Sequence, residues 1–541
     1  MQKADNYYVG VDVGTGSVRA GVFDRDGVCL GSAAHDITIF RSGADIVEQS
    51  SQNIWDRVCQ SVRQAVAEAR INPLDVSGIG FDATCSLVVV DTKGKPLTVS
   101  LSGKNSRNVI VWMDHRAIDQ AERINATGHR VLDYVGGRIS PEMETPKLLW
   151  LKENLPDTYH NAGHFFDLAD FLTWWATGDL SRSVCTVTCK WTYLAHEKAW
   201  DRSYFETVGL AELADADFAR IGQSVVDVGT PLGNGLTVDA AKALGLEPGT
   251  AVGAGLIDAH AGGVGTIGAA GPHEGETARM AYVFGTSACT MSSSAEKAFV
   301  PGVWGPYYSA MVPGLWLSEG GQSAAGHAIA QLVRFHPAYP FAQQTAQKAG
   351  CGILDYLLQK VAEKTTSLSD AALLANDIVV VPEFLGNRAP FADPEAKAVI
   401  SGLAHDETED SLIALYVAGI LGLGYGLRQI LNVQRANGVR PELVVISGGA
   451  GAHPIVKQLL ADAADISFAE PGTAEPVLLG SAMLGAVAAG QFGSVQSAMQ
   501  AMSRLGAQYT AVDGELRALH ERRFVAFEAL QQGARTARGA A

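Results

Sequence analysis

Runs of apolar residues separated by short polar turns recur along the chain, and the clearest example spans residues 7–23. A run with Val at alternate positions leads into a turn that contains Gly14 and Gly16, and a second run rich in Val is stopped by the turn signal DRDG. This pattern predicts a β-hairpin with the glycines in its turn. The familiar phosphate-loop fingerprints do not fit, because GxGxxG needs a glycine where Arg19 stands and the P-loop needs a Lys-Ser/Thr pair.

The same layout of strand, small-residue turn and strand recurs at residues 77–91 and 278–293. The first and third examples are the most alike, since Gly285-Thr286-Ser287 repeats the pattern of Gly14-Thr15-Gly16 about half a chain later. Two similar halves are therefore expected, with the glycine-rich stretch 269–277 as the boundary. The expected divisions are an N-terminal domain 1–270, a C-terminal domain 271–495 and a helical surface tail 496–541.

Much of the sequence between these predicted strands has apolar residues at helical spacing, which predicts helices. Residues 50–70 carry apolar positions at helical spacing, with Ser50 or Ser51 available as the cap. The apolar run 412–427 is shorter than the roughly 20 residues that a membrane span needs and holds four glycines, so a buried helix is expected. Strands mixed with helices predict α/β layers in each half.

Composition and charge narrow the class of protein. A chain of 541 residues suggests at least two domains. The net charge of −16 argues against nucleic acid as the main partner. Cysteines are scattered, and the closest pair, Cys185 and Cys189, has no second pair to complete a zinc site, so we expect buried thiols. The N-terminal residues lack an apolar signal core, and a reducing cytoplasm fits these features.

Two matched turns of Gly, Thr and Ser favour an anion site. Such turns present backbone N–H groups and hydroxyls without bulky side chains, which is a nest for phosphate oxygens. Asp12, before the first turn, is suited to orient Mg²⁺ through water. Arg19, on the returning strand, is suited to neutralise phosphate charge. A plain hairpin with polar turn residues explains one such loop equally well, but a matched pair facing across a cleft would hold a triphosphate from both sides.

A third glycine cluster follows an apolar strand at 442–447. Gly448, Gly449 and Gly451 end that strand, and Pro454 suits the first turn of a following helix. Glycines here would let a flat base lie against the backbone near a helix N-terminus. Two glycines between a strand and a helix are also common in proteins that bind no nucleotide, so this cluster is weak evidence for a base-binding site by itself.

Four of these segments occur in an order that resembles the FGGY carbohydrate kinases: DVGTGSVRAG, LIDAHAGG, FGTSAC and SGGAGAHP. The resemblance covers about residues 7–495. It implies an α/β fold with two ribonuclease-H-like domains, as in hexokinase and actin, on either side of a catalytic cleft. It also implies that ATP and Mg²⁺ bind in the cleft and that the γ-phosphate passes to a sugar hydroxyl.

The resemblance assigns roles to single residues. Asp258, at the end of a strand, matches the catalytic base that accepts the sugar's proton. Asp12 matches the metal-orienting carboxylate. Residues matching the nucleotide site are Gly14, Thr15, Gly16, Ser17 and Arg19 in the first loop, Gly285 and Thr286 in the second, and Gly326, Gly448, Gly449 and His453 around the adenosine. His453 stands where relatives often have Asn.

The sugar-side segments GFDATCS, WMDHR, CKWTY and SEGGQS look most like those of D-ribulokinases. In that reading the sugar is surrounded by Asp82, Ala83, Lys190, Asp258 and Glu319. Lys190 lies in the otherwise uncharged stretch SVCTVTCKWTYLA, where an unpaired lysine is costly, although a surface lysine is the alternative.

The resemblance implies phosphorylation of a ketopentose, D-ribulose to D-ribulose 5-phosphate first. Alternatives in the same family are L-ribulokinase, xylulokinase and kinases of other polyols. A nucleotide-driven clamp of the actin or chaperone type is an alternative of another class, which the cluster of Asp82, Lys190 and Glu319 disfavours. The expected partners are ATP and a small sugar, with no nucleic acid and no membrane. The resemblance also allows a homodimer.

Overall fold

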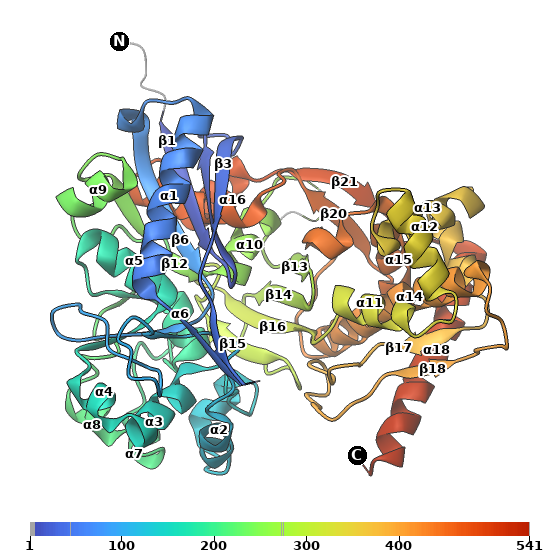
Figure 1. The fold of residues 1–541 in the computed structure, drawn as a ribbon, viewed down its shortest axis with the longest axis horizontal. Helices are drawn as coiled ribbons and strands as arrows, with labels where there is room; N and C mark the ends of the chain where they lie inside the picture. The colour runs from blue at the N-terminus through green and yellow to red at the C-terminus, as the bar shows by residue number, and fades with distance from the viewer. Residues whose placement is uncertain (1–5, 44, 272, 274, 540–541) are drawn as a thin grey trace.

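A computed structural model describes residues 6–43, 45–271, 273 and 275–539 of the chain (Figure 1). Two mixed β-sheets, one from each half of the sequence, dominate the structure, and helices cover their faces. Of the expected boundary 269–277, two residues lie outside the described part.

The first sheet has the strand order β12-β6-β1-β2-β3. Its strands are β1 (Tyr7–Val13), β2 (Ser17–Phe23), β3 (Cys29–Asp36), β6 (Val76–Ala83) and β12 (Ala251–Ile257). The β1–β2 and β2–β3 pairs are antiparallel, whereas β6 runs parallel to both β1 and β12. The first predicted hairpin is thereby confirmed.

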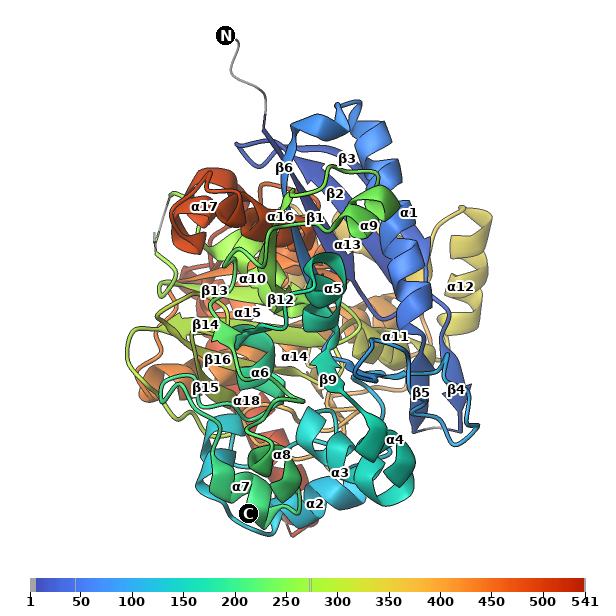
Figure 2. The same cartoon turned by 90° about the vertical axis from the view of Figure 1, so that its left-hand side faces the viewer.

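Helices α1 (Ser51–Ala69) and α5 (Leu168–Thr177) pack on one face of this sheet (Figure 2). Helix α16 (Pro476–Ala488), from the far end of the sequence, packs on the other face. Glycines make this approach possible. A Cβ added at Gly10, Gly78 or Gly80 would lie within 2.5 Å of a carbonyl oxygen of α16.

The second sheet repeats this arrangement in the order β15-β16-β14-β13-β19-β20-β21. Its strands are β13 (Arg279–Phe284), β14 (Ala288–Ser294), β15 (Trp304–Tyr308), β16 (Trp316–Gln322), β19 (Leu443–Ser447), β20 (Ser467–Pro471) and β21 (Leu505–Tyr509). The β13–β14 hairpin is antiparallel and β19 runs parallel to β13. Helix α10 (Asp258–Ile267), which follows the last strand of the first sheet, packs against both β13 and α16. The two halves therefore exchange helices, since α16 of the C-terminal half packs on the first sheet and α10 of the N-terminal half packs on the second.

A third sheet, in the order β4-β5-β8-β7-β9, lies in the N-terminal half. Its strands are β4 (Phe40–Ser42), β5 (Ile46–Gln49), β7 (Leu87–Val90), β8 (Val109–Ile110) and β9 (His164–Asp167). The segment 77–91, predicted as another strand-turn-strand unit, is divided between two sheets, because β6 joins the first sheet and β7 joins the third.

The remaining elements surround these sheets. In the N-terminal half they are α2 (Ile118–Asn125), α3 (Glu144–Asn154), α4 (Pro156–Asn161), α6 (Val184–Lys190), α7 (Arg202–Thr207), α8 (Ala211–Asp215), α9 (Val238–Leu244) and the pair β10 (Arg182–Ser183) and β11 (Val225–Val226). In the C-terminal half they are α11 (Gly326–Arg334), α12 (Tyr339–Lys348), α13 (Ile353–Lys364), α14 (Glu409–Ala436), α15 (Pro454–Ala464), α17 (Val495–Met502), α18 (Gly514–Ala537) and the pair β17 (Val379–Val381) and β18 (Val399–Ser401).

The helix expected at 50–70 is α1, and the side chain of Ser50 caps it by accepting a hydrogen bond from the Asn53 N–H at 3.3 Å. The apolar run 412–427 lies inside α14, which has 28 residues. This helix is longer than the apolar run suggested, and by length and composition it would suffice to cross a membrane. However, 83% of its most apolar window is buried inside the protein, which agrees with the predicted core helix.

The segment 496–541, expected as a helical tail, is more integrated than that. It includes β21, which pairs with β20 at the edge of the second sheet. Helix α18 buries Phe524 and Phe527 against the C-terminal core. The Ala- and Gln-rich composition indicated a surface helix but concealed both the short strand and this apolar contact.

Candidate active site at the junction of the two halves

Hydrogen bonds hold the first glycine turn, residues 14–16, in place. The Gly14 N–H donates to the Ser17 carbonyl at 3.0 Å, which closes the turn between β1 and β2. Two side chains donate hydrogen bonds to Thr15. Gln49 Nε2 donates to the Thr15 carbonyl oxygen at 2.7 Å, and Trp112 Nε1 donates to the Thr15 hydroxyl oxygen at 2.9 Å. Gly14 and Thr15 are half-buried and Gly16 is exposed, so the turn still offers backbone and hydroxyl groups to a ligand.

Asp12, at the end of β1, is only 4% exposed and is bound by Arg19 from the neighbouring strand. Arg19 Nε donates to Asp12 Oδ2 at 2.9 Å, and its Nη1 donates to Glu475 Oε2 at 2.8 Å. Arg19 was expected to neutralise phosphate charge. Its guanidinium contacts two carboxylates and positions Asp12, and its role toward phosphate stays a prediction.

Asp82 lies beside Asp12 in the parallel register of β1 and β6. It is 0% exposed, and the Ser481 hydroxyl of α16 donates to its Oδ2. Burial first, and then the charge of Asp12, raises the pKa of Asp82 well above its usual value. This carboxyl is buried beneath α16, and its Oδ1 has no hydrogen-bond partner in the protein. Its contact with the sugar stays a prediction. Ala83, the last residue of β6, is also 0% exposed.

Asp258 is the first residue of α10, directly after β12. Its Oδ1 accepts from the Ala259 N–H at 2.8 Å, while the side chain remains partly exposed. Burial and the negative charge of Asp12 raise the pKa of Asp258 to about 6. A carboxylate with this pKa is a competent proton acceptor near neutral pH, because the best general base has a pKa close to the working pH.

Lys190, at the end of α6, is 5% exposed, which excludes the alternative of a surface lysine. Its Nζ lies 4.7 Å from the centre of the Trp304 ring, a cation–π contact. Burial opposes its charge, but acidic groups around it, Cys85 and Glu319 among them, raise the pKa of Lys190 well above its usual value. Lys190 is therefore a buried, charged hydrogen-bond donor.

Glu319, on β16 of the second sheet, is 6% exposed and faces several cations. Its Oε2 lies 3.4 Å from His260 Nε2, and its Oε1 accepts from Arg388 Nη2 at 3.3 Å. Burial opposes the charge of Glu319, but Lys190 and His260 together lower its pKa. Lys190 and Glu319 thus form a charged cluster close to Asp258. That this cluster binds a sugar stays a prediction.

The second turn lies between β13 and β14 and is tied to α11. The Gly285 N–H donates to the Ser287 carbonyl at 2.9 Å, and the Gly285 carbonyl accepts from the Gly326 N–H at 3.0 Å. A Cβ on Gly326 would lie 2.9 Å from that carbonyl oxygen, which explains the glycine. The Thr286 carbonyl accepts from the Ala325 N–H at 2.9 Å.

A cavity of about 370 Å³ adjoins this turn. Residues lining it include Gly326, Leu354, Tyr416, Gly449, Ala450 and His453. Gly448 has a φ of 99°, and a Cβ there would lie 2.5 Å from the Phe284 carbonyl oxygen. The cavity is apolar enough and large enough to take a flat heteroaromatic base. His453 accepts from the Ile455 N–H at 3.2 Å and so caps α15 while lining the cavity.

Sequence reasoning missed several residues of this site. Arg388 comes from a loop whose sequence, FLGNRAP, gave no signal, yet its guanidinium carbon lies 4.6 Å from the centre of the Trp304 ring. Glu475 contacts Arg19 across 456 positions of sequence, which no local pattern reveals. Trp112 belongs to the WMDHR segment already singled out, but only the structure shows its bond to Thr15.

Comparisons with known proteins agree with this geometry. The N-terminal domain of the FGGY family of carbohydrate kinases matches residues 7–265, and the C-terminal domain of that family matches residues 280–489. A human FGGY carbohydrate kinase domain-containing protein is 46% identical over 513 residues, covering 93% of this chain and 92% of its own length. A D-ribulokinase of Saccharomyces cerevisiae is 38% identical over 518 residues, covering 90% of this chain and 72% of its own length.

Solved structures show the same fold at low sequence identity. A structure described as a xyloylose kinase from Brucella ovis has a TM-score of 0.80 and 19% identity, and it covers 98% of this chain and 100% of its own. A Plasmodium falciparum glycerol kinase with ADP has a TM-score of 0.76 and 16% identity, and it covers 97% of this chain and 98% of its own. With both family domains matched in order and a relative 46% identical over nearly its full length, the chain belongs to the FGGY family of carbohydrate kinases and is a sugar phosphotransferase.

Proposed function

We propose that this chain transfers the γ-phosphate of ATP to the terminal O5 of a ketopentose, with D-ribulose as the preferred substrate. The observation that carries the proposal is the buried cluster of Lys190 and Glu319 close to Asp258. The similarity to a yeast D-ribulokinase, 38% identical over 90% of this chain, supports the choice of sugar.

The cluster suits a polyol because it offers both donors and acceptors that are fixed in place. Lys190 and Arg388 only donate, and Glu319 only accepts. A sugar that lacks one of the matching hydroxyls leaves a buried charged group unpaired, at a cost of about 1–3 kcal/mol or more. A site of this kind rejects incomplete substrates more strongly than an apolar pocket would.

The chain's own residues supply the other parts of the reaction. Asp258 accepts the proton of the attacking O5 hydroxyl as the bond to phosphorus forms. The turns at 14–16 and 285–287 supply backbone N–H groups and hydroxyls for the phosphates. The cavity beside Gly449 and His453 has a volume of about 370 Å³ and suits the adenine. A primary hydroxyl reaches both the base and the γ-phosphate with the least crowding, which favours a terminal carbon. The resemblance to D-ribulokinases favours O5 over O1.

The donor set fits Mg²⁺. The Asp12 carboxylate lies beside the first phosphate turn, and its charge raises the pKa of nearby Asp258. Among the described residues no group of three or more His, Cys, Asp or Glu side chains forms a metal cage. One carboxylate with waters and nucleotide phosphates is the usual way in which Mg²⁺ is held. Asp12 would hold the ion, which when bound neutralises phosphate charge.

Two alternatives share most of this site. L-ribulose, D-xylulose and longer polyols need the same base and phosphate loops and differ only in the fit to the cluster. A nucleotide-driven clamp needs the nucleotide site but has no use for a buried Lys190–Glu319 cluster. Stimulation of ATP consumption by a sugar separates the enzyme from the clamp.

The test is a coupled ADP-release assay over D-ribulose, L-ribulose, D-xylulose, L-xylulose, ribitol, glycerol and D-glucose. We expect the highest kcat/KM for D-ribulose and poor turnover of aldoses, whose carbonyl lies one carbon away. A higher kcat/KM for glycerol or glucose would overturn the ketopentose assignment. ATP consumption that no sugar stimulates would favour the clamp.

A further inference from the structure

Thr15 of the first turn receives hydrogen bonds from two side chains of the third sheet and its flank. Gln49, the last residue of β5, is 1% exposed and donates from Nε2 to the Thr15 carbonyl at 2.7 Å. Trp112, two residues after β8, donates from Nε1 to Thr15 Oγ1 at 2.9 Å. The third sheet therefore braces the turn that the proposed function assigns to phosphate.

The direction of the Trp112 bond fixes the role of the Thr15 hydroxyl. An indole nitrogen donates and cannot accept, so Thr15 Oγ1 must be the acceptor. The hydroxyl's own proton takes no part in that bond. Within the described part of the chain, the Thr15 hydroxyl donates no hydrogen bond to another protein group. The hydroxyl is thus set up to donate to an incoming anion.

Trp112 is itself anchored to the segment that follows β6. Its backbone N–H donates to Ser86 Oγ at 3.1 Å, and Ser86 Oγ lies 3.1 Å from Thr84 Oγ1. Both Ser86 and Thr84 belong to the GFDATCS segment that the sequence assigned to the sugar. One tryptophan therefore contacts the sugar-side segment through its backbone and the phosphate turn through its ring.

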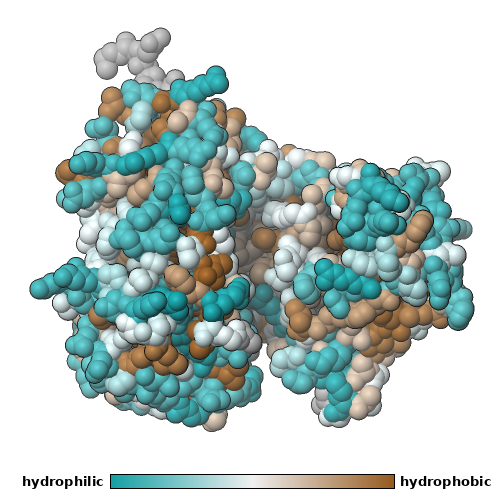
Figure 3. All heavy atoms as spheres, viewed as in Figure 1, coloured by the Kyte–Doolittle hydropathy of each residue, from teal (hydrophilic) through white to brown (hydrophobic). Residues whose placement is uncertain are grey.

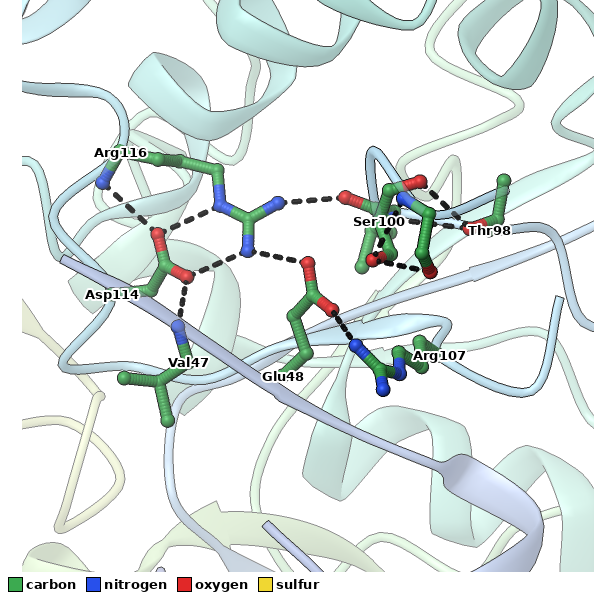
Figure 4. Close-up of polar contacts among 9 residues, drawn as sticks. Val47, Glu48, Thr98, Ser100, Arg107, Asp114 and Arg116 are labelled. Atoms are coloured by element: carbon green, nitrogen blue, oxygen red, sulfur yellow. Dashed lines mark hydrogen bonds and ion pairs between the residues drawn. The ribbon is translucent and has the colours of Figure 1, made fainter. Parts of the chain in front are cut away.

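A buried ion-pair network holds the residues after Trp112 in place (Figure 4). Asp114 Oδ2 accepts from the Val47 N–H at 2.7 Å, and Arg116 Nε donates to Asp114 Oδ1 at 2.8 Å. Arg116 Nη2 also pairs with Glu48 Oε1 at 3.0 Å. The side chains of Asp114, Arg116 and Glu48 are at most 2% exposed. The WMDHR segment is thereby fixed against β5, next to Gln49.

We propose that Trp112 is a positioning residue that orients the Thr15 hydroxyl to donate its proton to a phosphate oxygen of the nucleotide. Without the indole N–H, the hydroxyl is free to turn and must lose that freedom on binding. The inference rests on the proposed function only in taking the anion to be a nucleotide phosphate. Sugar recognition is not needed for it.

The test compares binding of ATP and of adenosine by titration calorimetry, with no sugar present. Trp112→Phe keeps an aromatic ring and removes the donor. We expect it to weaken ATP about three- to tenfold, the usual range for one hydrogen bond, and to leave adenosine unchanged. Trp200→Phe is the matched control, because Trp200 Nε1 also donates one bond, to the Gly222 carbonyl at 2.8 Å, away from the site. It should leave both affinities as in the parent.

Variants of Thr15 provide a second experiment, whose result does not depend on whether Trp112→Phe folds well. Thr15→Val removes the hydroxyl at constant shape and should weaken ATP at least as much as Trp112→Phe. Thr15→Ser keeps the hydroxyl and should lose less. In a Thr15→Val background, adding Trp112→Phe should cost nothing further, since the acceptor is gone.

Parental ATP affinity in Thr15→Val, or an additive loss in the double variant, would overturn the proposal. Equal weakening of ATP and adenosine by Trp112→Phe would also overturn it, because that marks general loosening of the structure. If the parent binds ATP and the Thr15 and Trp112 variants behave as expected, but no sugar is phosphorylated, the proposed function fails and this inference stands.

Discussion

Arg19 and Glu475 form an ion pair of 2.8 Å, although 456 positions separate them in the sequence. Arg19 lies on the strand after the first phosphate turn, and Glu475 directly precedes α16. Because α16 packs on the first sheet, this pair ties the start of the exchanged helix to the phosphate turn. The same guanidinium donates to Asp12, so it holds this carboxylate in place beside the turn.

Asp12→Asn should therefore raise the Mg²⁺ concentration needed for half-maximal activity and lower kcat by at least about tenfold. The substitution keeps the shape and removes the charge that would hold the metal. Glu475→Gln is the control, because it removes the other partner of Arg19 and leaves the Asp12 charge in place. A Mg²⁺ titration of initial rates measures both. Superimposable titrations for Asp12→Asn and the parent would rule out this role for Asp12.

Asp258→Asn should lower kcat by at least about 10²-fold, since loss of a general base typically costs that much. The fold and the affinity for ATP should be retained, which calorimetry and thermal unfolding would check. An amide still fits the hydrogen-bonding position next to Ala259 but cannot accept a proton. Turnover within tenfold of the parent would remove Asp258 from the catalytic role.

The pH dependence of the parent should report the same group. The pKa of Asp258 is raised to about 6, so kcat/KM should fall as the pH drops below about 6 and the base becomes protonated. The raised pKa also means that the ionised carboxylate destabilises the fold above about pH 6. Asp258→Asn should therefore have a higher Tm than the parent at pH 8, and the difference should shrink toward pH 4. A flat rate profile between pH 5 and 8 contradicts this assignment.

Lys190→Met keeps the length of the side chain and removes the donor. We expect a higher KM for the sugar with the KM for ATP nearly unchanged, because Lys190 lies in the cluster with Glu319 and Trp304 and not in the nucleotide cavity. Lys297→Met is the control, because Lys297 also lies over an aromatic ring, that of Trp316 at 5.9 Å, but is exposed. If Lys190→Met changed only the KM for ATP, Lys190 would be a nucleotide contact and not a sugar contact.

The two halves should close on each other when both substrates bind. Figure 3 shows a hollow between the N-terminal and C-terminal parts. The turns at 14–16 and 285–287 lie in different halves, so neither half holds all the phosphate contacts. Closure excludes water, which would otherwise accept the phosphate. Small-angle scattering with D-ribulose plus a non-hydrolysable ATP analogue should give a smaller radius of gyration than the free protein. Equal radii, with binding confirmed separately, would contradict closure.

Local sequence patterns predicted those helices, strands and turns whose formation depends mainly on neighbouring residues. The hairpins, α1 and the strand-glycine-helix unit β19–α15 follow from periodicity and turn residues. Lys190 stood out because an unpaired charge in an otherwise uncharged stretch is costly to bury, whereas its grouping with Glu319 came from the family resemblance. The complete burial of Asp82 was not predicted, because its environment is made by Ser481, 399 positions away. Arg388 and Glu475 were missed for the same physical reason, since packing between distant segments leaves no local signal.

Phosphorylation of the terminal hydroxyl of a ketopentose can be decided from the identity of the product. Purified protein incubated with D-ribulose, ATP and Mg²⁺ should give one ADP per sugar phosphate formed. The ³¹P spectrum of the product should show a phosphorus coupled to the two protons of a terminal CH₂ group. The ¹H spectrum should show that this CH₂ group is coupled to a neighbouring CH, which C5 has and C1, next to the carbonyl, lacks. A phosphorus coupled to a single proton, or ADP and inorganic phosphate without a sugar phosphate, would contradict phosphorylation of the terminal hydroxyl.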